Sequence, residues 1–257
     1  MERVKKILFV QIHDIWFDTA KYLECQYNVC TLHTNDILDR EKYDFRLTAK
    51  TFVLDISEEV EGIFSKFEYK SARYAINRAI RDGVKVYKIV TSEERSKYME
   101  FQRSFCEKRG IPVLREEELD FLSCYYALSK DGEYLGACAF LESADQRLVR
   151  YKYGATLHKL NANELILWSV MQIYHKLGYQ YFDFGGCIPT DDKESYYYRH
   201  FRFKKKFGGE LVDSYTYFKV RGLYRGLYWM FKEGVRLFFK GDINAFTNFL
   251  YEKNLLR

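Results

Sequence analysis

The 257-residue chain contains only two prolines and has no Gly/Ser-rich or low-complexity tract. Flexible linkers are built from such tracts, so the sequence shows no linker between separately moving domains. No repeat recurs at the period of a solenoid. A chain of this length can bury a sizeable core, as one large domain or as two small ones.

The cysteines and histidines lack the spacing of a metal site. Six cysteines are scattered along the chain without a CxxC pair, and five histidines show no metal-ligand spacing. This pattern argues against a structural zinc site and against a compact disulfide framework. We therefore expect reduced thiols, no bound metal and a reducing compartment.

Long hydrophobic runs are also missing. The N-terminus, MERVKKILFVQ, has basic residues followed by a run of four apolar residues before Gln11, whereas a secretory signal needs about 7–15. No run approaches the roughly 18 apolar residues of a transmembrane helix. These absences predict a cytoplasmic protein. The net charge of +5 permits an anionic partner, such as nucleotide, nucleic acid or membrane, without requiring one.

Two helices are well marked by their apolar spacing. Residues 71–82 (SARYAINRAIRD) place apolar side chains on one face, with Ser71 as the expected N-cap and Gly83 as a left-handed C-terminal residue. Arg73, Asn77 and Arg81 follow each other on another face. Residues 163–177 are apolar nearly all round, which predicts a helix deep in the structure.

The remaining pattern predicts a mixed sheet. Strand-like segments include KTFVLDIS, VKVYKIV, a hairpin turning on Asp131–Gly132, RLVRYKYGA, QYFDFGG and LVDSYTYFKV. A helix with a Thr91/Glu94 capping box lies between the second and third of these. In RLVRYKYGA, strict alternation places Arg150 and Lys152 on one face. The order of elements predicts an α/β (α+β) fold with a buried central helix.

These segments together resemble a known family. TFVLDIS, SARYAINRAIRDGVKVY, the buried helix after YKYGAT, FDFGG and FKKKFGGE occur in this order over residues 51–220. The combination is similar to the Fem-type branch of the GNAT acyltransferase superfamily, which includes peptidoglycan-bridge aminoacyltransferases and smaller BioF2-like acyltransferases. The resemblance implies a GNAT-like core at 71–220, an abbreviated N-terminal α/β portion at 1–70 and a helical extension at 221–257.

The resemblance also implies the type of reaction. GNAT-type enzymes transfer an acyl group to an amine without a covalent enzyme intermediate, and the donor enters where two neighbouring parallel strands splay. Here those strands would be RLVRYKYGA and QYFDFGG. Such a reaction needs an amine held in line, donors for the oxyanion and a proton for the leaving group. No nucleophile is required, which fits the absence of a GxSxG motif.

The end of QYFDFGG and the FKKK run contain the catalytic candidates. Asp183 can orient or deprotonate the amine, or can cap the turn that follows it. Gly185 and Gly186 either let the backbone approach a ligand closely or form a tight turn. Lys204 matches a lysine that Fem-type enzymes place near the transferred acyl group, although a lysine run is also typical of a solvated face.

Five further residues are candidates for binding the donor or substrate. Arg73 and Asn77 could hold phosphates or a peptide carboxylate, and Arg150 and Lys152 could meet a donor phosphate. Asn163 lies at the start of the central helix, where backbone N–H groups favour anions. The stretch before this helix, ATLHKLNAN, lacks the glycines of the pyrophosphate loop in GNAT enzymes that use acetyl-CoA. The donor could therefore be acyl-CoA or aminoacyl-tRNA.

Three functions remain open at this point. The first is an acyl-CoA-dependent N-acyltransferase that acts on an amino group of a sugar or peptide precursor in cell-envelope biosynthesis. The second uses aminoacyl-tRNA, and the third is a catalytically silent binding module. Residues 221–240 have an apolar stripe flanked by basic residues, so they could hold the protein at the inner face of a membrane near a lipid-linked amine acceptor.

Overall fold

A computed structural model describes residues 2–7, 10–111, 113–157, 159–195 and 197–221. The chain forms two compact units, one made of residues 1–49 and 213–257 and the other of residues 50–212. The predicted boundaries after residues 70 and 220 do not coincide with these units. Strands β4 (Phe45–Asp55) and β10 (Glu210–Val220) each continue from one unit into the other. The predicted helix at 221–240 lies outside the described residues.

In its described residues, the first unit is a small sheet with the α-helix α1 and a short 3-10 helix. Its strands follow the order β1-β2-β3-β10-β4, and the β2–β3 pair is parallel. Its elements are β1 (Glu2–Ile7), β2 (Val10–Trp16), α1 (Thr19–Glu24), β3 (Val29–Thr34), the short 3-10 helix η1 (Arg40–Lys42) and the adjoining parts of β4 and β10. Ile15, Tyr22, Leu32 and Tyr217 are fully buried in its core.

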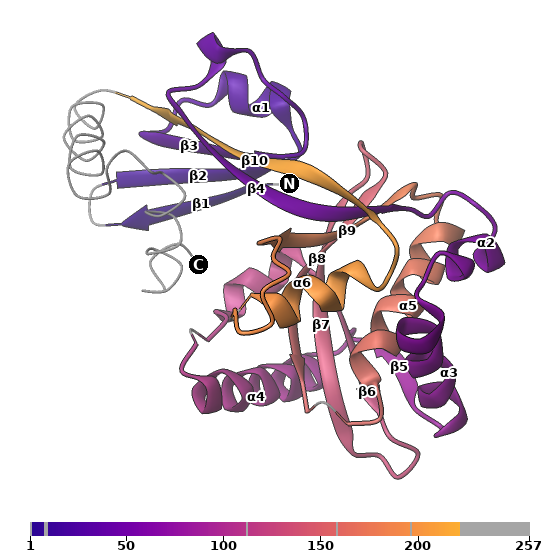
Figure 1. The fold of residues 1–257 in the computed structure, drawn as a ribbon. Coiled ribbons are helices and arrows are strands. Elements are labelled where there is room, and N and C mark those ends of the chain that lie inside the picture. Colours follow the sequence, from indigo (N-terminus) through magenta and orange to yellow (C-terminus); the bar gives the residue numbers. More distant parts are fainter. Residues whose placement is uncertain (1, 8–9, 112, 158, 196, 222–257) are drawn as a thin grey trace. The chain divides into compact units, whose positions relative to one another are not determined.

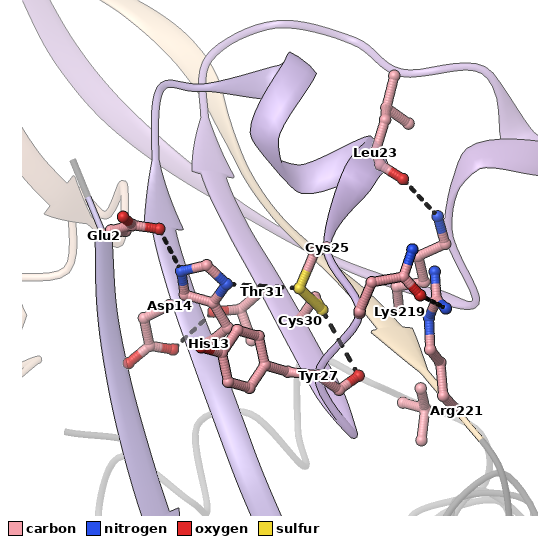
Figure 2. The surroundings of a disulfide bond; sticks show 12 residues. Glu2, His13, Asp14, Leu23, Cys25, Tyr27, Cys30, Thr31, Lys219 and Arg221 are labelled. Carbon is pink, nitrogen blue, oxygen red and sulfur yellow. Dashed lines mark hydrogen bonds and ion pairs between the residues drawn. A yellow bond between two sulfur atoms is a disulfide. The ribbon is translucent and has the colours of Figure 1, made fainter.

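This unit contains a disulfide, which corrects the expectation of reduced thiols. Cys25 and Cys30 are joined across the turn between α1 and β3. Figure 2 shows His13 beside this bond, with Nδ1 3.5 Å from the Cys25 sulfur, while Nε2 lies 2.5 Å from Glu2. The sequence argument missed the pair because four intervening residues do not match a CxxC motif. Cys106, Cys124, Cys138 and Cys187 are buried thiols outside this disulfide.

The second unit is built on a mixed sheet in the order β4-β9-β8-β7-β6-β5. The β8–β9 pair is parallel, and the other neighbouring pairs are antiparallel. The strands are β5 (Lys85–Lys88), β6 (Ser123–Leu128), β7 (Tyr134–Ser143), β8 (Leu148–Thr156) and β9 (Tyr181–Cys187). The helical elements are α2 (Val60–Ser65), η2 (Tyr69–Arg73), α3 (Tyr74–Arg81), α4 (Ser92–Arg109), η3 (Glu116–Phe121), α5 (Ala162–Lys176) and α6 (Tyr198–Lys205).

Two apolar clusters lie on the opposite faces of this sheet. Helices α3 and α5 pack with β6–β9 in the larger cluster, whereas α4 covers the other face (Figure 1). Ile166, Leu167 and Met171 of α5 are completely buried. Burying each such side chain contributes about 1.5–3 kcal/mol to the free energy of folding. The predicted buried central helix is therefore confirmed, except that Ile173 is 38% exposed.

Local signals in the sequence have mixed outcomes. The Thr91/Glu94 capping box is present, and Gly83 has the expected left-handed φ angle of 78°. Gly110, the C-cap of α4, is also left-handed, with a φ of 63°. The helix predicted to begin at Ser71 instead begins at Tyr69, with one π-helical turn that runs directly into α3. Ser71 therefore lies inside the helix and is not its cap. Among the described helices, none combines the length and apolar content that crossing a bilayer requires.

Candidate functional site

The candidate site lies in the second unit, at the place where two parallel strands part. β8 and β9 pair over three positions, from Leu148 opposite Tyr181 to Arg150 opposite Asp183. Beyond this point β8 continues to Thr156 alongside β7, and β9 continues to Cys187 alongside β4. This divergence occurs between the two strands that the sequence analysis proposed for donor entry.

The Asp183 carboxylate lies at the last paired position of β9, where the two strands begin to diverge. Its side chain is completely buried, and Arg150, which is 8% exposed, donates to Oδ2 from Nε at 2.9 Å and Nη2 at 2.8 Å. Thr51 Oγ1 and the Gly185 backbone N–H donate to Oδ1, at 2.5 and 2.7 Å. The carboxylate therefore joins β4, β8 and the glycine turn in one network.

These contacts determine the charge of Asp183. Burial raises the pKa of Asp183, but the Arg150 charge and the hydrogen bonds from Thr51 and Gly185 outweigh burial, so its pKa lies below the ordinary value. An ionised carboxylate that already accepts from three residues is a poor proton acceptor. The contacts favour the alternative in which Asp183 caps the turn, and a role toward an amine substrate stays a prediction.

The two glycines of the FDFGG motif have different environments. Gly185 is buried with a φ of +73°, and a Cβ there would lie 2.7 Å from the Tyr151 carbonyl oxygen. The pairing register of β4 and β9 shifts here, between Thr51–Gly186 and Val53–Asp183, which marks a bulge in β9. Gly186 is exposed, and a Cβ there would meet no atom within 4 Å. Gly185 is thus needed for the turn, while Gly186 borders open space.

Lys204 lies directly against this turn. Its Nζ donates to the carbonyl oxygens of Gly185 at 2.9 Å and Gly186 at 2.6 Å, across from α6 to β9. Burial lowers the pKa of Lys204 to about 8. The other two lysines of the run differ, because Lys205 is exposed and Lys206 pairs with Glu164 at 2.6 Å. Of the run, Lys204 is therefore the lysine that contacts the glycine turn.

A second polar group lies at the start of α5. Asn163 Oδ1 accepts from the Cys138 thiol at 3.0 Å, and the Tyr151 hydroxyl interacts with both side chains. Burial raises the pKa of Tyr151 and of Cys138 well above their ordinary values, so both groups remain protonated. Asn163 thus makes internal contacts to β7 and β8, and donor binding by its side chain stays a prediction.

The predicted alternation of β8 is wrong beyond Tyr151. Opposite β7, Ala139 pairs with Tyr153 but Phe140 pairs with Tyr151, so Lys152 is an extra, bulged residue. Because of this bulge, Tyr151 packs in the α5 cluster and Tyr153 in the α4 cluster. Lys152 therefore does not continue the face of Arg150, and its ammonium lies 5.7 Å from the Tyr153 ring.

The predicted α3 residues are placed elsewhere. Asn77 and Arg81 are exposed on α3, and the Arg73 guanidinium lies 5.0 Å from the Tyr69 ring. The hydrogen bonds given above for Asp183 and Lys204 come from β4, β8, β9 and α6, and not from α3. A binding role for Arg73 and Asn77 stays a prediction about a separate surface.

Sequence reasoning missed Thr51 and Tyr151. Thr51 is 132 positions from Asp183, and nothing in KTFVLDIS distinguishes it as a partner of a carboxylate. Tyr151 was interpreted as an ordinary alternating strand residue. The pairing of strands, which the sequence does not encode locally, brings both residues to the site.

Of the comparisons with known proteins, the one with solved structures shows the fold. No family model matches the sequence, and no match was found among curated proteins. A solved structure of FemX superposes with a TM-score of 0.63 at 13% identity, covering 89% of this chain and 85% of FemX. L-PGS from Bacillus licheniformis gives a TM-score of 0.58 at 12% identity, covering 88% and 83%.

A third solved structure extends this likeness. The C-terminal domain of a putative lysylphosphatidylglycerol synthetase from Agrobacterium fabrum gives a TM-score of 0.58 at 12% identity, covering 91% of this chain and 85% of that one. At such identities the likeness defines the fold. It confirms the predicted Fem-type architecture with its mixed sheet and helices.

Proposed function

We propose that this protein is an N-acyltransferase that moves an acyl group from acyl-CoA to an amino group of a sugar or peptide precursor in cell-envelope biosynthesis. The observation that carries the proposal is Lys204, an ammonium held by two backbone carbonyls at the point where β8 and β9 part. The Fem-type fold supports an acyl transfer, and the acyl donor and acceptor are inferred from chemistry.

In the proposed reaction the amine attacks the thioester carbonyl directly. A C–N bond forms, the C–S bond breaks, and the proton lost by the amine ends on the leaving thiol. An ammonium has three N–H groups, and the two carbonyls of the glycine turn take two of those of Lys204. The third is available to the oxyanion of the tetrahedral intermediate, where such a donor is worth about 10²–10³ in rate.

Asp183 has a positioning role in this proposal. Its hydrogen bond to the Gly185 N–H fixes the bulge of β9, and the bulge aims the carbonyl oxygens of Gly185 and Gly186 at Lys204. Arg150 compensates the Asp183 charge inside the protein. Gly186 leaves room for the acyl group, because a Cβ there would meet no atom of the described residues within 4 Å.

Aminoacyl-tRNA as the donor is the second candidate. The fold is shared with FemX and with the C-terminal domain of a protein named as a putative lysylphosphatidylglycerol synthetase. The stretch before α5 has no glycine, and Leu160 and Asn161 adopt positive φ angles of 51° and 53° without one. The missing glycine loop favours a donor that does not present the pyrophosphate of CoA.

A thermal-shift and transfer experiment tests these proposals. Acetyl-CoA and longer acyl-CoAs should raise the melting temperature of the wild-type protein in a dose-dependent manner. Flat melting curves with every acyl-CoA, together with salt-sensitive binding of charged tRNA, would replace acyl-CoA by aminoacyl-tRNA. A response to neither donor would favour the catalytically silent module.

Two variants test the site itself. Lys204→Met keeps the length and apolar stem of the side chain but removes the ammonium, and should lower the transfer rate about 10²-fold or more. Gly186→Ala should fold normally, since its Cβ meets no atom within 4 Å, yet should weaken binding of the acyl group. Unchanged turnover in Lys204→Met would remove Lys204 from the proposed mechanism.

A further inference from the structure

A basic surface on η2 and α3 is not used by the proposed transfer reaction. We define the basic face as Lys70, Arg73, Arg78 and Arg81, together with the neighbouring Tyr69, Tyr74 and Ile80. Residues 69–81 contain these four cations and no carboxylate, whereas the net charge of the whole chain is +5. Four positive charges therefore lie together on one helical segment about 20 Å long.

The helix geometry turns these cations outward. Ala72, Ala75, Ile76 and Ala79 form the buried side of the helix, which packs in the α5 cluster. Lys70, Tyr74, Asn77 and Arg81 follow at intervals of three and four residues on the opposite side, and all four are exposed. The segment is thus a basic face on a helix that is anchored by its apolar side.

The charges of the basic face are scarcely neutralised. In the described part of the chain, the one ion pair from these four cations joins Arg78 Nε to Asp82 at 3.6 Å. Arg73 lies over the Tyr69 ring, and its buried Nε has no hydrogen-bond partner among the described residues. An anionic partner would supply the missing counter-charges.

Exposed apolar groups on the same helical segment indicate the kind of anionic partner. Tyr69 is 70% exposed, and Tyr74 and Ile80 are each 55% exposed. Tyrosine rings favour the boundary between lipid headgroups and water, and an aliphatic side chain gains from entering it. A nucleic acid could use the cations and the tyrosines, but it offers little to an exposed isoleucine. The combination therefore fits a lipid surface better than a nucleic acid.

We infer that the basic face docks this protein on an anionic membrane. The phosphates of the lipid headgroups contact Lys70, Arg78 and Arg81, while Tyr74 and Ile80 enter the headgroup layer. The face begins close to the proposed active site, because the Glu68 N–H donates to the Lys206 carbonyl at 2.9 Å and the Lys206 ammonium pairs with Glu164 of α5. A docked molecule would therefore hold the Lys204 side of the unit near a lipid-linked acceptor.

The experiment measures partition of the full-length protein onto vesicles and needs no acyl substrate, so its failure would leave the transfer proposal untouched. Vesicles of phosphatidylcholine alone are compared with vesicles that also contain phosphatidylglycerol. The double variant Lys70→Gln/Arg81→Gln is matched by Arg103→Gln/Lys108→Gln on α4, which removes one exposed lysine and one exposed arginine from another surface. Both pairs lower the net charge equally, and melting curves verify folding.

The proposal predicts binding that requires phosphatidylglycerol and weakens with salt. The Lys70/Arg81 pair should reduce partition roughly 30-fold, at about 5-fold per cation near the surface, and the control pair should change it little. Ile80→Ser should weaken vesicle binding, and the size of this loss should be the same at low and at high salt because it comes from an apolar contact. Equal losses from both charge pairs, or no preference for anionic vesicles, would overturn the proposal. The proposal would also be overturned if the Lys70→Gln/Arg81→Gln variant lost binding to single-stranded RNA but still bound vesicles like the wild type.

Discussion

Replacing Asp183 by asparagine removes one charge from a completely buried ion pair without changing the size of the side chain. The Arg150 guanidinium, which is 8% exposed, would remain inside the protein without its counter-charge. Removing one partner of such a pair costs about 3–5 kcal/mol. An amide at this position can still accept from the Gly185 N–H, so we expect the free energy of unfolding to fall by about 3 kcal/mol, the lower end of that range.

Urea denaturation of three variants measures this effect. Asp183→Asn and Arg150→Met each break the pair, whereas the double variant removes both charges and leaves no buried unpaired ion. The double variant should therefore be more stable than the sum of the single losses predicts, with a coupling energy of about 2 kcal/mol or more. Thr51→Val serves as the control, since it deletes one hydrogen bond to the same carboxylate and should cost about 1–3 kcal/mol.

The pH dependence gives an independent check of the same network. The pKa of Asp183 is lowered in the folded protein, so its contribution to stability is complete above the pKa of the unfolded chain. That contribution is lost as pH falls through the folded pKa. The stability difference between wild type and Asp183→Asn should therefore shrink on acidification. A difference below about 1 kcal/mol at neutral pH, or one that does not change with pH, would refute the assignment of a buried ionised pair.

Three further predictions concern the glycine turn, the lysine and the disulfide. Gly185→Ala, with its φ of +73° and its Cβ 2.7 Å from the Tyr151 oxygen, should lose at least about 1–3 kcal/mol in denaturation, while Gly186→Ala should be nearly neutral. The pKa of Lys204 is about 8 in the folded protein against an ordinary 10.5. As the pH rises from about 8 to 10.5, the free energy of unfolding of the wild type should therefore increase relative to Lys204→Met by up to roughly 3 kcal/mol. A stability difference that stays constant over this pH range would contradict the lowered pKa. The Cys25–Cys30 disulfide closes a short loop, so Cys25→Ser/Cys30→Ser should lower stability by about 2 kcal/mol, and a dithiol reductant should reproduce that loss in wild type only.

Much of the fold could be predicted because its signals are local. The capping box at Thr91, the left-handed glycine after α3, and the apolar run of α5 each act within a few residues. The strand that ends in FDFGG was recognisable for the same reason. The start of the helix at Tyr69 was not, because a π-helical turn is favoured by packing and not by a capping residue.

The less predictable features depend on distant parts of the chain. The partner of Asp183 on β4 follows from the order of strands in the sheet, and the bulge at Lys152 follows from a mismatch between β7 and β8. The two units share β4 and β10, whose residues are continuous in sequence, so composition gives no sign of where one unit ends. The disulfide likewise depends on how α1 and β3 approach each other.

The contacts of Asp183 also narrow the chemistry that the site can perform. Because Arg150, Thr51 and Gly185 all donate to this carboxylate, taking up a proton would cost it interactions with each of them. In the proposed reaction the amine would therefore have to arrive neutral, or lose its proton to the leaving group or to water. Lys204 can help only as a cation, and it is mostly protonated below a pH of about 8. In the proposed reaction Lys204 would stabilise developing negative charge, and the transfer rate should follow the basicity of the acceptor amine.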